Sequence, residues 1–267
     1  MNHRIEVEKG VRVYVVEWGQ GKPIIFISGW PFDSRSYEYQ FNQISKQGFR
    51  CIGIDMRGFG KSDKPWEDYN YDFFADDVHK VLQSLKVKDG LLVGHSMGGA
   101  ISLHYAAKYS KMHIAKLMLC GAAAPSFTQK PEHPYGMTVQ EVNDLLKLCE
   151  SDRAKMLTNF GKIFFKKEIS PELAQWLWST GMEASAYATA ACIELLRDAD
   201  LRSDMSKVTI PTLIAHGRYD KICPYEFAET LNKNIAYSQL VPFEESGHGL
   251  FYDEREKFNQ TIMDFAR

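Results

Sequence analysis

The chain has 267 residues, of which 45% are hydrophobic and 25% charged, a composition typical of an ordinary folded protein with a sizeable core. The formal net charge of −2 comes from 32 basic and 34 acidic residues without a basic cluster, which argues against a nucleic-acid partner. No run approaches the roughly 18 apolar residues of a membrane span, and residues 1–10 lack the apolar centre of a signal peptide, so we expect a cytoplasmic protein without a membrane partner.

Strands and helices alternate in the first part of the chain. The strand candidates are short and rich in apolar and β-branched residues, and the helix candidates carry apolar residues at helical spacing. The expected strands are residues 11–18, 23–28, 50–55, 90–94 and 116–120, and the expected helices are residues 73–85 and 97–109. This alternation predicts an α/β fold with a largely parallel sheet covered on both faces.

The pattern changes after Ala124, where only helical periodicity is found up to residue 201. The expected helices are residues 139–149, 153–165, 171–180 and 186–196; strands return at 211–215 and 238–241, and a last helix covers 255–265. A helical segment between two parts of one sheet predicts a lid over the sheet edge. We therefore divide the chain into a first core part (1–124), a helical lid (125–201) and a second core part (202–267).

The five cysteines are scattered through the chain and never form a C-x-x-C pair. Such spacing predicts neither a disulfide framework nor a metal site, and buried free thiols are the expected state. The cysteines are Cys51, Cys120, Cys149, Cys192 and Cys223.

The strongest local motif is Gly-His-Ser-Met-Gly-Gly at residues 94–99. It follows an apolar strand and opens a helix, which is the context of a nucleophile elbow: a tight turn that exposes a serine at the carboxyl edge of a sheet. The alternative is a glycine-rich turn whose serine only caps the helix. The strand before the motif and the helix after it favour Ser96 as a catalytic nucleophile.

A serine nucleophile needs a base, and the base needs an orienting acid. His248 lies in Ser-Gly-His-Gly between the strand at 238–241 and the last helix, whereas the other histidines fall in helices, near ends or in the elbow itself. Asp220 follows the strand at 211–215 and gives the order serine, acid, histidine. The rival position after Cys120 reads Gly-Ala-Ala-Ala and offers no carboxylate.

Acyl transfer also needs N–H donors for the developing oxyanion. The first expected donor is the backbone of Met97, directly after the serine. The second is Trp30, in the loop Ser28-Gly29-Trp30-Pro31, because Pro31 has no N–H and restricts Trp30 to extended geometry. A plain strand-ending turn is the alternative for this loop.

Five segments together resemble the α/β-hydrolase superfamily, and within it the cofactor-free non-haem haloperoxidase, arylesterase and perhydrolase group. They are SGWP (28–31), DMRGFGKS (55–62), GHSMGG (94–99), GRYD (217–220) and GHG (247–249). The resemblance implies an eight-stranded, mostly parallel sheet, a small lid, no metal or haem, and hydrolysis of small esters through an acyl-enzyme on Ser96. It further implies a side reaction with hydrogen peroxide, matched by Pro31, and a purely structural role for residues 55–62. One departure is Ser28, where the family usually has histidine.

Aromatic residues on the oxyanion loop and in the lid suggest an apolar pocket. They are Trp30, Phe32, Phe127, Tyr135, Trp176, Trp178 and Tyr187, of which we assign only Trp30 and Phe32 to the substrate site. The expected partner is a small, neutral ester; self-association stays open. Lactam, thioester or carbon–carbon hydrolysis would use the same triad, and a low-turnover small-molecule sensor is the rival from another class.

Overall fold

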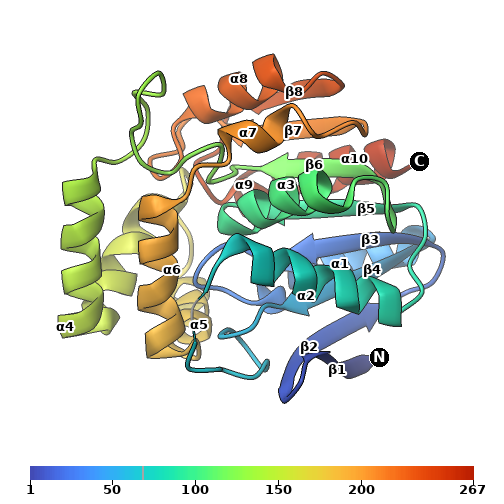
Figure 1. The fold of residues 1–267 in the computed structure, drawn as a ribbon, viewed down its shortest axis with the longest axis horizontal. Coiled ribbons are helices and arrows are strands. Elements are labelled where there is room, and N and C mark those ends of the chain that lie inside the picture. The colour runs from blue at the N-terminus through green and yellow to red at the C-terminus, as the bar shows by residue number, and fades with distance from the viewer. Residues whose placement is uncertain (68) are drawn as a thin grey trace.

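The computed structural model describes residues 1–67 and 69–267. One sheet of eight strands runs through it with helices on both sides (Figure 1). The strands are β1 (Asn2–Glu8), β2 (Val11–Trp18), β3 (Lys22–Ile27), β4 (Phe49–Asp55), β5 (Gly90–His95), β6 (Ile114–Cys120), β7 (Thr212–Gly217) and β8 (Ser238–Phe243). Their order in the sheet is β1-β2-β4-β3-β5-β6-β7-β8.

Strands β4, β3, β5, β6, β7 and β8 pair in parallel, whereas β1 and β2 are antiparallel to their neighbours. The expected α/β-hydrolase fold with an eight-stranded, mostly parallel sheet is therefore confirmed. The residue pattern alone did not predict β1, because this edge strand buries only Ile5 and exposes most of its other side chains.

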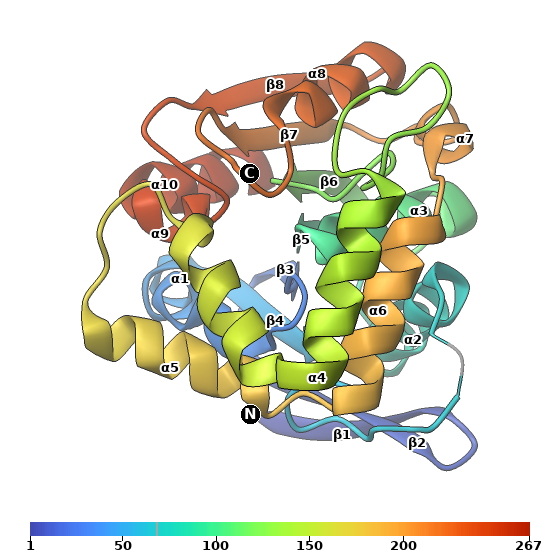
Figure 2. The ribbon, with the colours of Figure 1, turned by 90° about the vertical axis from the view of Figure 1, so that its left-hand side faces the viewer.

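The helices that cover the sheet lie in two layers. Helices α2 and α3 pack together on one face, and α1 packs with α10 on the other (Figures 1 and 2). The helices are α1 (Glu38–Ile44), α2 (Tyr71–Ser84), α3 (Met97–Tyr109), α4 (Val139–Phe164), α5 (Pro171–Met182), α6 (Ala186–Asp198), α7 (Arg202–Met205), α8 (Tyr225–Asn234), α9 (Leu250–Asp253) and α10 (Arg255–Ala266). Of these, α1, α7, α8 and α9 had not been predicted.

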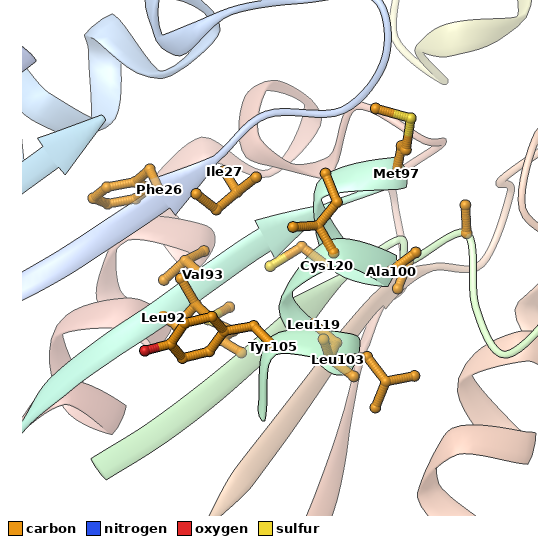
Figure 3. Close-up of a cluster of buried hydrophobic side chains, with 14 of the residues drawn as sticks. Phe26, Ile27, Leu92, Val93, Met97, Ala100, Leu103, Tyr105, Leu119 and Cys120 are labelled. Carbon is orange, nitrogen blue, oxygen red and sulfur yellow. The ribbon is translucent and has the colours of Figure 1, made fainter. Parts of the chain in front are cut away.

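The core of the sheet is built from uninterrupted apolar strands. Phe26 and Ile27 on β3, together with Leu92 and Val93 on β5, are fully buried. Figure 3 shows this cluster running up to Met97, where β5 ends and α3 begins. The elbow is thus anchored in a fully buried part of the core, where a small displacement costs many contacts.

Helices α4, α5 and α6 lie between β6 and β7 in the chain and in front of the carboxyl ends of the parallel strands (Figure 2). The Leu201 N–H donates to the Pro125 carbonyl at 2.8 Å and joins the two ends of this segment. Helix α4 is broken at Asp152, with φ −153° and ψ 75°, and the Asp152 carboxylate accepts the Lys155 N–H at 2.9 Å as the cap of the second half. The predicted interruption between residues 149 and 153 is therefore confirmed.

All five cysteines are buried and free, as expected. Among residues 1–67 and 69–267, no helix combines the length and the apolar character that a membrane crossing requires.

Candidate active site

Ser96 occupies the turn between β5 and α3 in a strained conformation. Its φ of 55° and ψ of −122° lie in a region that side chains other than glycine rarely adopt. The neighbouring glycines make this turn sterically feasible. A Cβ on Gly98 would lie 2.3 Å from the Ile27 carbonyl oxygen, and one on Gly94 would lie 2.3 Å from the Gly98 oxygen. The motif is thus a tight strand–helix turn that holds one serine at the sheet edge.

His248 and Asp220 form a buried pair. His248 Nδ1 lies 2.7 Å from Asp220 Oδ2, and both side chains are fully buried. The other ring nitrogen, His248 Nε2, has no hydrogen-bond partner among the residues that the structure describes. An imidazole held at Nδ1 by a carboxylate, with Nε2 unused, is arranged to exchange a proton with a third group.

The ionised form of the Asp220 carboxyl group is stabilised by its neighbours. Burial alone would raise the pKa of its carboxyl group, but the adjacent His248 and His216 outweigh this and lower the pKa well below its usual range. Asp220 Oδ1 also accepts the backbone N–H groups of Ile222 and Cys223 at 2.8 and 2.9 Å. Asp220 therefore stays ionised at neutral pH.

Two further histidines, His95 and His216, support this pair, and no sequence motif predicted a role for them. His95 Nε2 lies 2.9 Å from the His248 carbonyl oxygen, and the two rings are 4.6 Å apart. Burial, together with the neighbouring His248, lowers the pKa of His95 to about 3, so His95 is neutral and donates its Nε2–H to that carbonyl. His216 Nε2 donates to the Cys223 carbonyl at 2.8 Å and lies 3.4 Å from Asp220 Oδ2. In the sequence, the only indication that either histidine lies near the site is the position of His95 directly before Ser96.

The loop that carries His248 is tied to the end of α4 by Asp253. This buried carboxylate accepts three backbone N–H groups, from Gly247 at 2.8 Å, Lys166 at 2.9 Å and Lys167 at 3.0 Å. The Gly249 N–H donates to the Phe164 carbonyl at 2.9 Å. No sequence pattern predicted this role of Asp253, because its three partners come from two segments about 80 residues apart.

The loop with Trp30 packs directly against the serine. A Cβ on Gly29 would lie 2.7 Å from Ser96 Cβ, and the Trp30 indole N–H donates to the Thr189 carbonyl on α6 at 3.1 Å. Within the described part of the chain, the backbone N–H groups of Trp30 and Met97 donate no hydrogen bond. Met97 follows the serine directly and Trp30 lies in the loop packed against it, so these two free N–H groups are candidates for contacting a developing negative charge.

Ser28, the departure from the usual histidine, stabilises the same loop in another way. Its hydroxyl donates to the Asp33 carbonyl at 2.7 Å and lies 3.2 Å from the Ser36 hydroxyl. Ser36 donates to the same carbonyl at 2.9 Å. The loop that follows β3 is therefore held by serine hydroxyls on a backbone oxygen, with no imidazole involved.

The space at Ser96 is small and apolar. A cavity of about 30 Å³ includes Ser96 and is lined by Trp30, Ala123, Phe127, Val142, Leu145, Phe160, Ile193, Leu196 and Ile222. A larger groove of about 510 Å³ lies between α4 and α5 and does not include the serine. Phe32, predicted to line the substrate pocket, lines this outer groove. The other lid aromatics differ: Phe127 lines the inner cavity, Trp178 lines the groove, and Tyr187 stacks on Trp66 at 4.1 Å.

No group of three or more His, Cys, Asp and Glu side chains is arranged to hold a metal ion anywhere in residues 1–67 and 69–267.

Sheet order, inserted helices and a serine elbow define the class of protein. Residues 22–255 match the family described as alpha/beta hydrolase fold, and the chain belongs to that family.

The individual proteins that this chain resembles are hydrolases and haloperoxidases. It is 48% identical over 266 residues to the AB hydrolase superfamily protein YisY of Bacillus subtilis (strain 168), with 100% of this chain and 99% of that protein covered. Its structure resembles an esterase (EaEST) from Exiguobacterium antarcticum, at a TM-score of 0.98, 45% identity, and 100% and 99% coverage. A bromoperoxidase from Bacillus anthracis is similar at a TM-score of 0.95, 33% identity and 99% coverage of both chains.

Proposed function

We propose that this protein is a serine carboxylesterase for small apolar or aryl esters, with Ser96 as nucleophile, His248 as base and Asp220 as orienting acid. The observation that carries the proposal is the buried His248–Asp220 pair, in which His248 Nε2 is free. The backbone carbonyl of His248 is bound by His95, the residue directly before the serine. The relatives named as an esterase and a bromoperoxidase support ester chemistry on this fold.

The proposed reaction has two halves. Ser96 Oγ attacks the ester carbonyl carbon while His248 Nε2 takes the hydroxyl proton, and the carbonyl electron pair becomes an oxyanion. Collapse of this intermediate breaks the bond to the alcohol oxygen, which receives the proton from His248. Water then repeats the sequence on the acyl-enzyme, releasing the carboxylic acid and restoring Ser96.

Each neighbouring group has a defined task in this scheme. Ionised Asp220 accepts the Nδ1–H of His248, which leaves the lone pair on Nε2 for the serine proton and stabilises the imidazolium once it forms. The free N–H groups of Trp30 and Met97 are the proposed oxyanion donors. Met97 also begins α3, whose positive dipole end favours the same negative charge.

The inner cavity supports a preference for short acyl groups. One water molecule needs about 10–15 Å³ of such a cavity. A cavity of about 30 Å³ therefore holds roughly two water-sized groups. Its lining is almost wholly apolar apart from Ser96, which disfavours a charged acyl group. We infer that acetyl and propionyl esters fit and that octanoyl esters do not. We also infer that residues 125–201 act as a lid, because Phe127, Val142 and Ile193 from this segment close the cavity.

The test compares p-nitrophenyl acetate, butyrate and octanoate with wild type and Ser96→Ala. The expected result is many turnovers in wild type, fastest for acetate, and a loss of about four orders of magnitude or more in kcat for Ser96→Ala. Retained activity in Ser96→Ala would remove the nucleophile assignment. A single acylation that stalls, detected by intact mass, would favour the sensor instead. Circular dichroism confirms that the variant is folded.

A second candidate activity is perhydrolysis, in which hydrogen peroxide replaces water as the acceptor of the acyl group. The observation that favours it is the Trp30 carbonyl, which precedes Pro31 and accepts no hydrogen bond among the described residues; it is thus free to accept one from peroxide. Attack of peroxide on the acyl-enzyme releases a peracid and restores Ser96. Monochlorodimedone bromination with peroxide, acetate and bromide detects the peracid, and equal rates for wild type and Pro31→Leu would argue against a role for this residue.

A further inference from the structure

Two hollows in this molecule share one wall. The cavity at Ser96 and the outer groove are both lined by Phe160, on the second half of α4. Phe160 is half-buried, and its ring packs edge-on against Trp30, with centroids 5.4 Å apart, and against Phe164 at 5.5 Å. One aromatic side chain therefore separates the space beside the serine from a hollow many times larger.

The groove has the size and character of a ligand site. Its volume of about 510 Å³ lies within the range of about 300–1,000 Å³ typical of small-molecule pockets. Its walls include Phe32, Leu157, Phe164, Leu177 and Trp178, all of them apolar. The charged Lys162, Lys167 and Glu168 also line it and are exposed, so the groove opens to water at one side.

The groove lies on the side of the site from which an alcohol would leave. Phe164 lines the groove and packs edge-on against the His248 ring, with centroids 5.0 Å apart. In ester hydrolysis the base returns its proton to the departing alcohol oxygen. A leaving group that receives a proton from His248 is therefore next to this groove, whereas the acyl group is next to Trp30 and the inner cavity.

We propose that the groove is the binding site for the alcohol part of the substrate, and that Phe160 determines specificity by dividing it from the acyl cavity. The proposal rests on the esterase function above and narrows its substrate class. The preferred substrates are esters of a short acid with a large apolar alcohol, such as an aryl or long-chain alkyl alcohol. Burial of each methylene group is worth about fourfold in kcat/KM, so a six-carbon alcohol gains substantially over methanol.

Gly161 allows the groove to be filled without disturbing the fold. It lines the groove, and a Cβ built on it meets no atom within 4 Å. Gly161→Phe should lower kcat/KM for hexyl acetate and 2-naphthyl acetate at least tenfold, with methyl acetate unchanged. The matched control is Asn159→Phe, which adds the same ring to α4 at an exposed position that does not line the groove. Equal effects of the two variants would overturn the proposal.

Phe160→Ala tests the dividing role. Removing the ring joins the two spaces, so the ratio of kcat/KM for p-nitrophenyl octanoate over acetate should rise at least tenfold. An unchanged ratio in a folded variant would show that Phe160 does not set this specificity.

A binding measurement separates failure of the groove from failure of the esterase function. Ser96→Ala should bind 2-naphthol, followed by its fluorescence, and the additional Gly161→Phe substitution should weaken this binding at least tenfold. Binding that is unaffected by Gly161→Phe would refute the groove assignment even if ester hydrolysis depends on Ser96. Binding that is weakened, in a protein whose hydrolysis does not depend on Ser96, would leave the groove in place and overturn the triad.

Discussion

Replacement of Asp253 by asparagine should cost both stability and activity. The carboxylate is 1% exposed and accepts three backbone N–H groups, two of them at Oδ2. An asparagine side chain can keep its oxygen at the Oδ2 position, but its NH₂ group then faces the Lys167 N–H, and neither can accept. Hydrogen bonds to charged groups contribute about 1.5–3 kcal/mol each. Losing one and weakening two to neutral bonds lowers the free energy of unfolding by about 3 kcal/mol.

In a chain of this length, about 3 kcal/mol corresponds to a fall in Tm of roughly 6–12 °C. Because Gly247 is the residue before His248, we also expect kcat for p-nitrophenyl acetate to fall about tenfold, with KM little changed. Circular dichroism melting and steady-state kinetics measure the two effects. Asp264→Asn is the control, since that carboxylate is exposed and, among the residues that the structure describes, pairs only with Arg267 and Gln260, a contribution of about 0–1 kcal/mol. A Tm within 2 °C of wild type for Asp253→Asn would refute the reasoning.

Three further substitutions test other parts of the molecule. Asp220→Asn should lower kcat by about four orders of magnitude, because an amide in that position favours the wrong tautomer of the base; a fall below tenfold in a folded variant would contradict this. Gly98→Ala should yield little folded protein, because its Cβ would lie 2.3 Å from the Ile27 carbonyl oxygen; a wild-type melting curve would contradict this. The hydrogen bond that His104 donates to the Asp204 carboxylate raises the pKa of His104, so the stability that it provides is fully present below about pH 6.5 and is lost as the pH rises through the folded-state pKa. His104→Gln should therefore destabilise more at pH 5.5 than at pH 9, measured by urea unfolding, and equal losses would contradict this.

The parts of the fold that the sequence predicted are those whose signal is local. Strand β2 and helix α3 have the predicted bounds, because β-branched alternation and the glycine-rich elbow are visible in a short window. The parts that were missed depend on tertiary contacts. Strand β1 is a mostly exposed edge strand, and α8 covers only 10 residues after a proline. Strand β1 shows little apolar alternation, whereas α8 does carry apolar residues at helical spacing, Phe227, Ala228 and Leu231, but over a short span.

The same distinction holds at the site. Ser96, Asp220, His248, Trp30 and Met97 were proposed from strand-end motifs, since the carboxyl ends of parallel strands meet at one edge. Phe32, predicted to line the substrate pocket, lines the outer groove that we propose binds the alcohol part of the substrate. The ties made by Asp253 are long-range hydrogen bonds without a sequence pattern, so only three-dimensional structure brings them into view.

The three buried histidines at the site can act together only if His95 is uncharged. Proton transfer from Ser96 would place a positive charge on His248, whose ring lies 4.6 Å from His95. A charged His95 would oppose that step by several kcal/mol at an effective dielectric constant of about 20. Burial and the neighbouring His248 prevent this by lowering the pKa of His95 to about 3, while its Nε2–H still fixes the His248 backbone. The single negative charge of Asp220 is thus left to balance the one positive charge that the proposed reaction creates.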